Sequence, residues 1–258
     1  MSADRLCVVI PCFRRQDLLR KALESAAGSP VLLVDDSVQG LDWTGFSAEV
    51  LRTEGALGFS GAANRGMAWA EDQGFSWVLL LNDDARLEPG ALEALVRVVE
   101  NRPDVDAAGP LLYGPEGLES AGFCLSPRTA RLVQRKDVPT QPSPVLALSG
   151  ACLFLRSHLR FDEGFPHSFE DVDLGLRIKA RGQKSIVVPQ ARCWHQGGST
   201  VDRRSPRATR DALYGHLRLV ADSPHKRALV VGYALGQVLK EGPRLSRLNA
   251  LWQAWRLS

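Results

Sequence analysis

The sequence predicts an α/β protein with a mostly parallel central sheet flanked by helices, followed by a C-terminal helical extension. Short apolar runs alternate with segments of helical periodicity through the first half of the chain, which is the pattern of βαβ units. Two of the apolar runs end directly in acidic residues. Residues 203–258 carry eleven Lys or Arg and three Asp or Glu, whereas residues 1–202 carry 21 and 26. We therefore expect an acidic body at 1–202 and a basic helical extension at 203–258.

The first half of the chain supplies four strands and three helices. The apolar runs that we expect to be strands are Leu6–Ile10, Val31–Val34, Glu49–Arg52 and Trp77–Leu81. Apolar residues at helical spacing predict helices over Asp17–Ala27, Ala62–Asp72 and Ala91–Glu100. Gly28 and Pro30 end the first of these helices, and Pro89 precedes the third. Because strands and helices alternate, we expect these strands to pair in parallel.

The second half is less regular. We assign three further apolar segments to the sheet or core, the last as a final strand: Ala107–Tyr113, Val145–Leu155 and Ile186–Val188. The segment Gly114–Pro144 is rich in Pro, Gly and Ser, so we expect a variable region with short strands. Acidic residues before it and Gly182 after it bound a helix over Asp171–Ala180, and the pattern from Pro206 onward is helical.

Length and composition exclude several classes of protein. A chain of 258 residues, 45% hydrophobic and 24% charged, can bury a sizeable core without disulfides or a structural metal. The longest nearly uncharged apolar runs, Val145–Leu155 and Ala228–Leu239, fall short of the ~20 residues that span a bilayer. The N-terminus lacks a signal-peptide pattern, and the five cysteines form no C-x-x-C pair. We therefore expect a cytoplasmic protein without a disulfide framework or a cysteine zinc site.

Acidic groups follow two predicted strands, where α/β sheets bind their ligands. Asp35 and Asp36 end the second strand, and the triplet 82–84 ends the fourth. Because ligands bind outside the carboxyl ends of such strands, both groups point to one crevice. A divalent cation would relieve the repulsion between the carboxylates, and His195 would add a nitrogen ligand that favours Mn²⁺ over Mg²⁺. A solvated acidic turn and a structural histidine are the alternatives.

Two further segments carry candidate chemistry. Glu170 and Asp171 open a predicted helix, where they would serve as a helix cap or as a base for a hydroxyl nucleophile near a metal-bound phosphate. The glycine-rich segment 58–66 matches neither a dinucleotide-binding motif nor a P-loop. Its small residues would allow close approach of a ligand, with Arg65 reaching a diphosphate, or close packing of a helix.

The ordered set of these segments resembles glycosyltransferase family 2, whose members have the GT-A fold. The resemblance covers about residues 6–200 and rests on these segments in order: Val8–Arg15, Leu33–Ser37, Gly58–Gly66, Leu80–Asp84, Gly150-Ala151, Glu170–Arg177 and His195. It implies an enzyme that transfers a sugar from a nucleoside diphosphate to a hydroxyl group with inversion at the anomeric carbon. Some relatives of this size transfer rhamnose.

The resemblance also implies roles for individual residues. The nucleotide-sugar site would comprise Pro11, Phe13, Arg15, Asp35, Arg65, Asn82 and Asp83. The metal ligands would be Asp84 and His195, the catalytic base Asp171, and the acceptor-site residues Glu170 and Trp194. Arg14 stands where relatives often carry Asn, and Asn82 replaces the first Asp of the D-x-D motif. These departures concern the base and sugar preference more than the reaction.

The partners expected from the resemblance are a UDP- or dTDP-linked sugar, a glycan or lipid-linked acceptor and Mn²⁺ or Mg²⁺. We expect no nucleic acid, and leave a homo-oligomer open. One alternative is a sugar-nucleotide pyrophosphorylase, which would need a glycine-rich basic loop after the first strand, where this chain has no glycine. Another is a non-catalytic nucleotide-sugar-binding subunit, against which the joint presence of Asp84, Asp171 and His195 argues.

The basic extension suggests a membrane contact. Trp252 and Trp255 near its end are residues typical of membrane interfaces, and its net positive charge would hold the protein at the anionic inner face of a membrane. The alternative is that these tryptophans pack against the body or a second subunit and that the charge is solvated.

Overall fold

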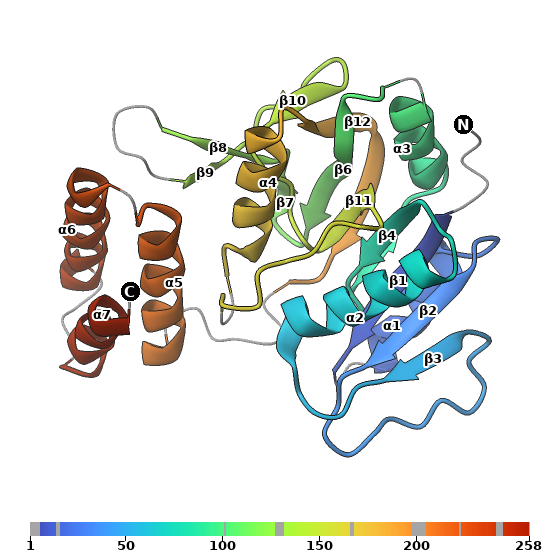
Figure 1. Ribbon diagram of the computed structural model, residues 1–258, viewed down its shortest axis with the longest axis horizontal. Helices are drawn as coiled ribbons and strands as arrows, with labels where there is room; N and C mark the ends of the chain where they lie inside the picture. Colours follow the sequence, from blue (N-terminus) through green and yellow to red (C-terminus); the bar gives the residue numbers. More distant parts are fainter. Residues whose placement is uncertain are drawn as a thin grey trace.

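The computed structural model describes residues 6–13, 16–100, 102–126, 132–165, 168–197, 205–221, 223–240 and 245–257. Figure 1 shows a body built on a central sheet with helices on both faces, and three C-terminal helices beside it. The α/β architecture and the helical C-terminus expected from the sequence are therefore confirmed.

The strands of the first half meet at the centre and one side of the sheet. They are β1 (Leu6–Cys12), β2 (Val31–Asp35), β3 (Glu49–Arg52) and β4 (Trp77–Leu81). The main sheet has the order β10-β12-β6-β11-β4-β1-β2-β3. β1 pairs in parallel with β2 and with β4, and β3 adds in parallel to β2. The carboxyl ends of β1, β2 and β4 therefore lie at the same edge of the sheet.

The second half makes the sheet mixed. Its strands in the main sheet are β5 (Ala85–Leu87), β6 (Val105–Gly114), β7 (Gly117–Ser120), β10 (Ser143–Val145), β11 (Cys152–Arg156) and β12 (Lys184–His195). β11 lies antiparallel between β4 and β6, whereas β12 runs parallel to β6. A separate pair of strands, β8 (Phe123–Leu125) and β9 (Leu132–Gln134), falls in the expected variable region. Parallel pairing thus holds for the first half, and β11 breaks it because no helix crosses over between β6 and β11.

Four helices cover the two faces of the sheet. α1 (Gln16–Ser25) and α3 (Ala91–Glu100) pack on one face, and α2 (Gly58–Asp72) and α4 (Glu170–Ala180) pack on the other. Successive strand residues serve opposite faces, so Val8 belongs to the first apolar cluster and Val9 to the second. A Cβ added to Gly66 would lie 2.4 Å from Cγ1 of Val9, so glycine at this position allows α2 to lie close to β1. Gly66 therefore serves helix packing.

The last strand is longer than the sequence indicates. The apolar run predicts Ile186–Val188, but β12 continues to His195 after a register shift between Val188 and Arg192. The shift accommodates the polar and proline residues that interrupt the apolar run. His195 consequently ends the strand and does not follow it as expected, and β5 pairs beside it.

The C-terminal helices are α5 (Pro206–Leu219), α6 (Pro224–Lys240) and α7 (Leu245–Leu257). They share an apolar cluster of their own, formed by Leu213, Leu217, Val220, Val230, Val238, Leu251 and Ala254. In Figure 1, α5 lies between the body and the other two helices. Among the helices described, none combines the length and apolar character needed to cross a membrane. The boundary at residue 202 stays a prediction.

Candidate active site

The carboxyl ends of β1, β2 and β4 form the edge at which the predicted donor-site residues meet. The register places Cys12 opposite Asp35, and the turn 82–84 continues directly from β4. Burial raises the pKa of the Cys12 thiol well above its usual range, and the charges of Asp83 and Asp35 raise it further. Both carboxylates are thus close to the same thiol. The structure places five of the expected donor-site residues at this edge: Pro11, Phe13, Asp35, Asn82 and Asp83.

Asp35 orders the loop that follows β2. Its Oδ1 accepts hydrogen bonds from the backbone N–H and the hydroxyl of Ser37, at 3.0 and 2.6 Å. Its Oδ2 accepts from the backbone N–H of Leu41 and from Nε1 of Trp43, at 2.9 and 3.0 Å. Burial would raise the pKa of Asp35, but these four hydrogen bonds outweigh it and hold the pKa below its usual value. The expected contact of Asp35 with a nucleotide base stays a prediction.

Asp36 has a structural role that the sequence did not reveal. Its Oδ1 accepts from the hydroxyl of Thr53 at 2.7 Å and from the backbone N–H of Leu57 at 2.9 Å. Its Oδ2 accepts from the N–H of Gly58 at 2.8 Å. Gly58 has φ +76°, a conformation that favours glycine. Asp36 therefore ties the first turn of α2 to the end of β2, and α2 begins earlier than the predicted Ala62.

Asp84 and His195 come together as the sequence predicts. β5 pairs with the end of β12, with Ala85 opposite His195, and this brings the buried Asp84 beside the imidazole. Nε2 of His195 lies 3.3 Å from Oδ1 of Asp84, and Nδ1 lies 3.0 Å from Oε2 of Glu119 on β7. Burial would lower the pKa of His195, but its hydrogen bonds and charge interactions with these carboxylates raise it to about 10. This position therefore favours positive charge.

The donor set at this position fits a divalent cation. A carboxylate oxygen and an imidazole nitrogen suit Mn²⁺, and Glu119 holds the ring as second-sphere carboxylates do in metal sites. Within the described part of the chain, no group of three or more His, Cys, Asp or Glu side chains could hold a metal ion. The described residues therefore offer two ligands here, and further ligands would be water or substrate oxygens.

Asp171 lies in the first turn of α4. Its Oδ2 accepts from the backbone N–H of Gly150 at 3.2 Å, and its Oδ1 accepts from the N–H of Val172 at 2.8 Å. In the same turn, 149–151, the carbonyl of Ala151 accepts from the N–H of Asn82 at 3.0 Å. One short backbone segment thus connects the end of β4 with the Asp171 carboxylate. Burial raises the pKa of Asp171 despite its backbone hydrogen bonds.

Glu170 is the second carboxylate of this turn. Its Oε2 is buried without a hydrogen-bond partner among the described residues. Burial and the neighbouring charge of Asp171 raise the pKa of Glu170. The two carboxyl groups hold a proton more readily than isolated carboxyl groups do, which a simple helix cap would not require.

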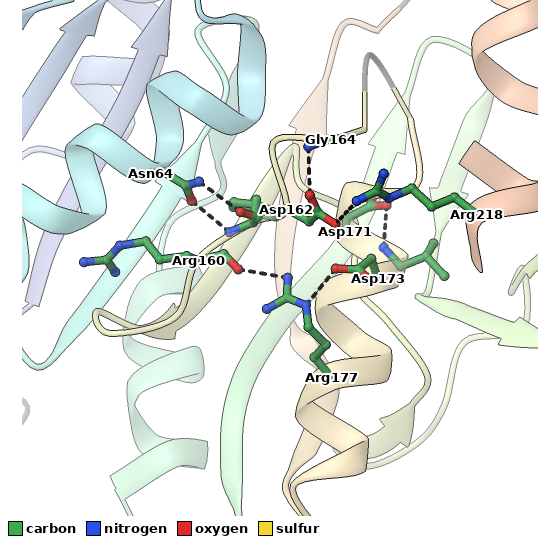
Figure 2. A network of polar contacts seen from close by, with 10 residues as sticks. Asn64, Arg160, Asp162, Gly164, Asp171, Asp173, Arg177 and Arg218 are labelled. Carbon is green, nitrogen blue, oxygen red and sulfur yellow. Dashed lines mark hydrogen bonds and ion pairs between the residues drawn. The ribbon is translucent and has the colours of Figure 1, made fainter. Parts of the chain in front are cut away.

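The loop 160–165 before α4 is held by three helices (Figure 2). Asn64 of α2 makes hydrogen bonds of 2.8 and 3.0 Å with the backbone of the loop. Arg177 of α4 donates to a loop carbonyl at 2.9 Å. Arg218 of α5 forms an ion pair of 2.7 Å with Asp162. The loop is therefore fixed by contacts from both the body and α5.

Phe169, the residue before Glu170, has an unusual backbone. Among the described residues, it is the non-glycine residue with a positive φ, 77°, a conformation that is costly for a bulky side chain. Its ring stacks on His216 of α5, with centroids 5.4 Å apart. A Cβ added to Gly215 would lie 2.7 Å from Cδ2 of Phe169, so α5 packs tightly against this turn.

With this geometry established, comparison with known proteins assigns the family. Residues 3–213 match the family described as "Glycosyltransferase like family 2". The chain belongs to this family. The match includes all the site residues named above except those of α5 beyond residue 213.

Two relatives illustrate the family's range. The N-acetylglucosaminyl-diphospho-decaprenol L-rhamnosyltransferase of Mycobacterium tuberculosis (strain ATCC 25618 / H37Rv) is 31% identical over 182 residues, which cover 62% of this chain and 58% of that protein. The O-antigen biosynthesis protein RfbC of Myxococcus xanthus is 26% identical over 226 residues, covering 75% of this chain and 17% of that protein. The chain thus matches little more than half the length of its mycobacterial relative.

Two solved structures share the fold. GalNAc-T7, solved with UDP, GalNAc and Mn²⁺, gives a TM-score of 0.65 at 17% identity, covering 84% of this chain and 47% of that one. The mannosyltransferase PcManGT of Pyrobaculum calidifontis, solved with GDP-Man and Mn²⁺, gives 0.57 at 14% identity, covering 98% and 81%. At this identity the likeness concerns the fold, and it confirms the GT-A fold expected from the sequence.

The structure gives no contact that assigns the expected roles of three predicted site residues of this family 2 chain. Arg15 lies outside the described residues. Arg65 is exposed, while its neighbours on α2 face the sheet. Trp194 lines a small cavity of about 40 Å³ with Asp84 and Arg86, and the guanidinium of Arg86 lies 5.1 Å from the centroid of its indole ring. The roles expected for these residues stay predictions.

Glu119 is the site residue that the sequence analysis missed. It lies 76 positions from His195 in the sequence, in the segment expected to be variable, and no motif surrounds it. Only the pairing of β7 with β6, and of β6 with β12, brings the two side chains together.

Proposed function

We propose that this protein is an inverting glycosyltransferase that moves a sugar from a nucleoside-diphosphate donor to a hydroxyl of a glycan or lipid-linked acceptor. The observation that carries the proposal is the turn 149–151. Its backbone accepts a hydrogen bond from Asn82 at the strand-end crevice and donates one to the Asp171 carboxylate. A base is thereby held beside a crevice suited to a sugar nucleotide.

The donor site in this proposal is the edge formed by β1, β2 and β4. Pro11, Phe13, Asp35, Asn82 and Asp83 would contact the nucleoside and sugar. Family membership supports a nucleoside-diphosphate donor, and we propose a UDP- or dTDP-linked sugar. The name of the mycobacterial relative, which specifies L-rhamnosyl transfer to a decaprenol-linked acceptor, supports rhamnose and a lipid-linked acceptor as the first choices to test.

Asp171 acts in this proposal as the general base. It takes the proton of the acceptor hydroxyl while the hydroxyl oxygen bonds to the anomeric carbon, and the bond from that carbon to the diphosphate oxygen breaks. Attack opposite to the leaving diphosphate inverts the configuration. A raised pKa suits this role, because a more basic carboxylate accepts a proton more readily.

Asp84 and His195 would hold a divalent cation, Mn²⁺ or Mg²⁺. The two solved neighbours contain Mn²⁺, which supports this part of the proposal. Bound there, the cation would neutralise the charge that develops on the leaving diphosphate. Glu119 keeps Nε2 of His195 turned toward Asp84 through its contact with Nδ1.

The proposed function is tested by incubating the protein with a panel of nucleotide sugars and Mn²⁺ and measuring nucleoside diphosphate release. We expect one donor to be hydrolysed slowly without acceptor and faster with a suitable glycan or polyprenyl-diphosphate sugar, and a chelator to stop both reactions. Tight donor binding without any turnover across acceptors would instead support the non-catalytic subunit. Full activity in chelator would contradict the metal assignment of Asp84 and His195.

A further inference from the structure

The side of α6 and α7 that faces away from their shared apolar cluster is itself apolar. We call it the outer face and define it by Leu229, Tyr233, Leu235, Leu239, Trp252 and Trp255, all of which are exposed. Figure 1 shows that these two helices lie beyond α5, on the side away from the central sheet. Nearly half of the large hydrophobic residues that are exposed in the described chain belong to this one face.

α6 is apolar on its outward side as well as on its buried side. Val230 and Val238 are buried against α5 and α7, and the opposite side presents Leu229, Leu235 and Leu239 to solvent. Gly232 and Gly236 lie on the same outward side, where an added Cβ would meet open space. From residue 228 to 239 the helix has no charged residue, so no polar side covers the apolar one. A surface helix normally turns charged residues to solvent, so this side is suited to contact with another apolar phase.

The tryptophans of α7 carry cationic partners. The guanidinium of Arg256 lies 4.7 Å from the ring centroid of Trp252, and that of Arg227 on α6 lies 5.1 Å from that of Trp255. Both indoles are about half exposed. An indole beside a guanidinium combines an apolar ring with a group that binds phosphate, which is the combination that residues at a lipid headgroup boundary require.

In the described parts of α6 and α7, all the charged residues have the same sign. The described parts of 223–257 contain five Lys or Arg and no Asp or Glu. One of the five, Arg247, donates to the hydroxyl of Thr209 on α5 and so turns away from the outer face. The other four are Lys226, Arg227, Lys240 and Arg256. Lys226 and Lys240 lie near the two ends of the apolar side of α6. This arrangement complements a surface that is apolar beneath a layer of negative charge.

We propose that the outer face docks on a membrane surface containing anionic phospholipids. The leucines and tryptophans would enter the headgroup boundary, while the lysines and arginines would contact lipid phosphates. The helices would lie on the membrane without crossing it, which agrees with their length and composition. The inference does not depend on the proposed function, because a membrane contact requires neither a particular donor nor a lipid-linked acceptor.

A second copy of the chain is a poorer occupant. Two outer faces brought together would place the same four cations opposite one another without any acidic residue from the described parts of α6 or α7 to pair with them. An anionic membrane supplies the negative charge that such a dimer lacks.

Flotation of the full chain with liposomes tests the proposal. We expect co-flotation with vesicles of phosphatidylcholine and phosphatidylglycerol, little with phosphatidylcholine alone, and release as salt is raised to ~1 M. The double variant Leu235→Ser/Leu239→Ser should reduce the bound fraction at least tenfold. Because both side chains are exposed, its circular dichroism and melting temperature should match the wild type. Val138→Ser, which alters a similarly exposed residue of the body, is the matched control and should float like the wild type.

Three results would overturn the proposal. Equal recovery in the unbound fraction with both lipid mixtures would exclude the membrane, and undiminished flotation of the double variant would exclude the outer face. A dimer in sedimentation velocity that the double variant abolishes, without lipid binding, would assign the face to a second copy.

Discussion

Glu170 and Asp171 lie next to each other in the first turn of α4, and burial raises the pKa of both carboxyl groups. The native state therefore binds protons here more readily than the unfolded chain. Since a raised native pKa contributes stability at acid pH, that contribution is present below the ordinary carboxyl pKa of about 4.3 and is lost as pH rises through the native value.

Glu170→Gln should therefore raise the free energy of unfolding at pH ~8, and the gain should shrink as pH falls toward ~4. The substitution removes a buried negative charge that the native state disfavours. Urea unfolding across this range measures the effect. Glu93→Gln, in the exposed first turn of α3, is the control for the loss of a charge at a helix start. A gain independent of pH would show that the pKa of Glu170 is the same in the native and the unfolded state.

Glu119 orients the imidazole of His195 beside Asp84 through its contact with Nδ1 of His195. Glu119→Gln should weaken Mn²⁺ binding by ~10- to 100-fold, the usual cost of losing a second-sphere carboxylate. Electron paramagnetic resonance of free Mn²⁺ measures this affinity independently of activity. Glu116→Gln, in the exposed turn before β7, should bind Mn²⁺ as the wild type does. If the Glu119→Gln variant binds Mn²⁺ as tightly as the wild type does, Glu119 serves packing and not metal binding.

At the scale of elements, the tight contact between α2 and β1 is the clearest packing constraint. Gly66→Ala should lower the free energy of unfolding by ~1–3 kcal/mol, because the new methyl group would overlap Val9 and Val34. Gly232→Ala is the matched control: its Cβ would meet open space within a helix, so stability should rise by ~0.5–1 kcal/mol. Chemical denaturation compares the two, and equal effects would contradict the packing assigned to Gly66.

α5 connects the C-terminal helices to the acceptor side of the proposed site. His216→Ala should lower acceptor-dependent turnover more than it weakens donor binding, because the stack on Phe169 holds the backbone just before Glu170 and Asp171. His216→Phe keeps the stack and should restore most of the turnover. His225→Ala, on the exposed side of α6, is the control. Equal losses in the Ala and Phe variants would show that ring stacking is not what matters.

Buried apolar runs were the elements best predicted from the sequence. β4 and α3 have the expected bounds, because apolar runs and helical periodicity mark buried elements directly. β3 also has the expected bounds, although most of its residues are exposed. The end of β12 was missed because Pro189 and polar residues interrupt its apolar run. The antiparallel placement of β11 was missed as well, since pairing direction depends on where the chain returns and leaves no local pattern.

The residues of the candidate site likewise fall into a group that the sequence predicted and a group that it did not. Asp84, His195 and Asp171 were predicted because each falls at a motif or at the end of an element. The partners Glu119 and Asp36 depend on contacts between segments far apart in the chain, which no spacing rule reveals. Asp35 accepts four hydrogen bonds from the loop that follows β2. Its position in a motif did not predict that it orders this loop.

At the scale of the whole molecule, the body and the C-terminal segment differ in net charge and in the surface that each presents. The body carries more acidic than basic residues and contains the edge formed by β1, β2 and β4, and the C-terminal segment is strongly basic and presents the outer face. The ion pair of Arg218 with Asp162 and the stack of His216 on Phe169 link the two parts. We infer that the two parts on either side of residue 202 differ in composition and have separate apolar cores. The contacts between them hold them together, so they do not move independently.

The most direct test of the central claim compares donor binding and sugar transfer in Asp171→Asn. The account predicts that the dissociation constant for the nucleotide donor stays near the wild-type value while transfer at saturating acceptor falls by ~10²- to 10⁴-fold, because the variant cannot take the acceptor proton. Asp72→Asn, an exposed carboxylate at the end of α2, should transfer at the wild-type rate. Wild-type turnover in Asp171→Asn would contradict the account and leave Asp171 as a helix-start residue.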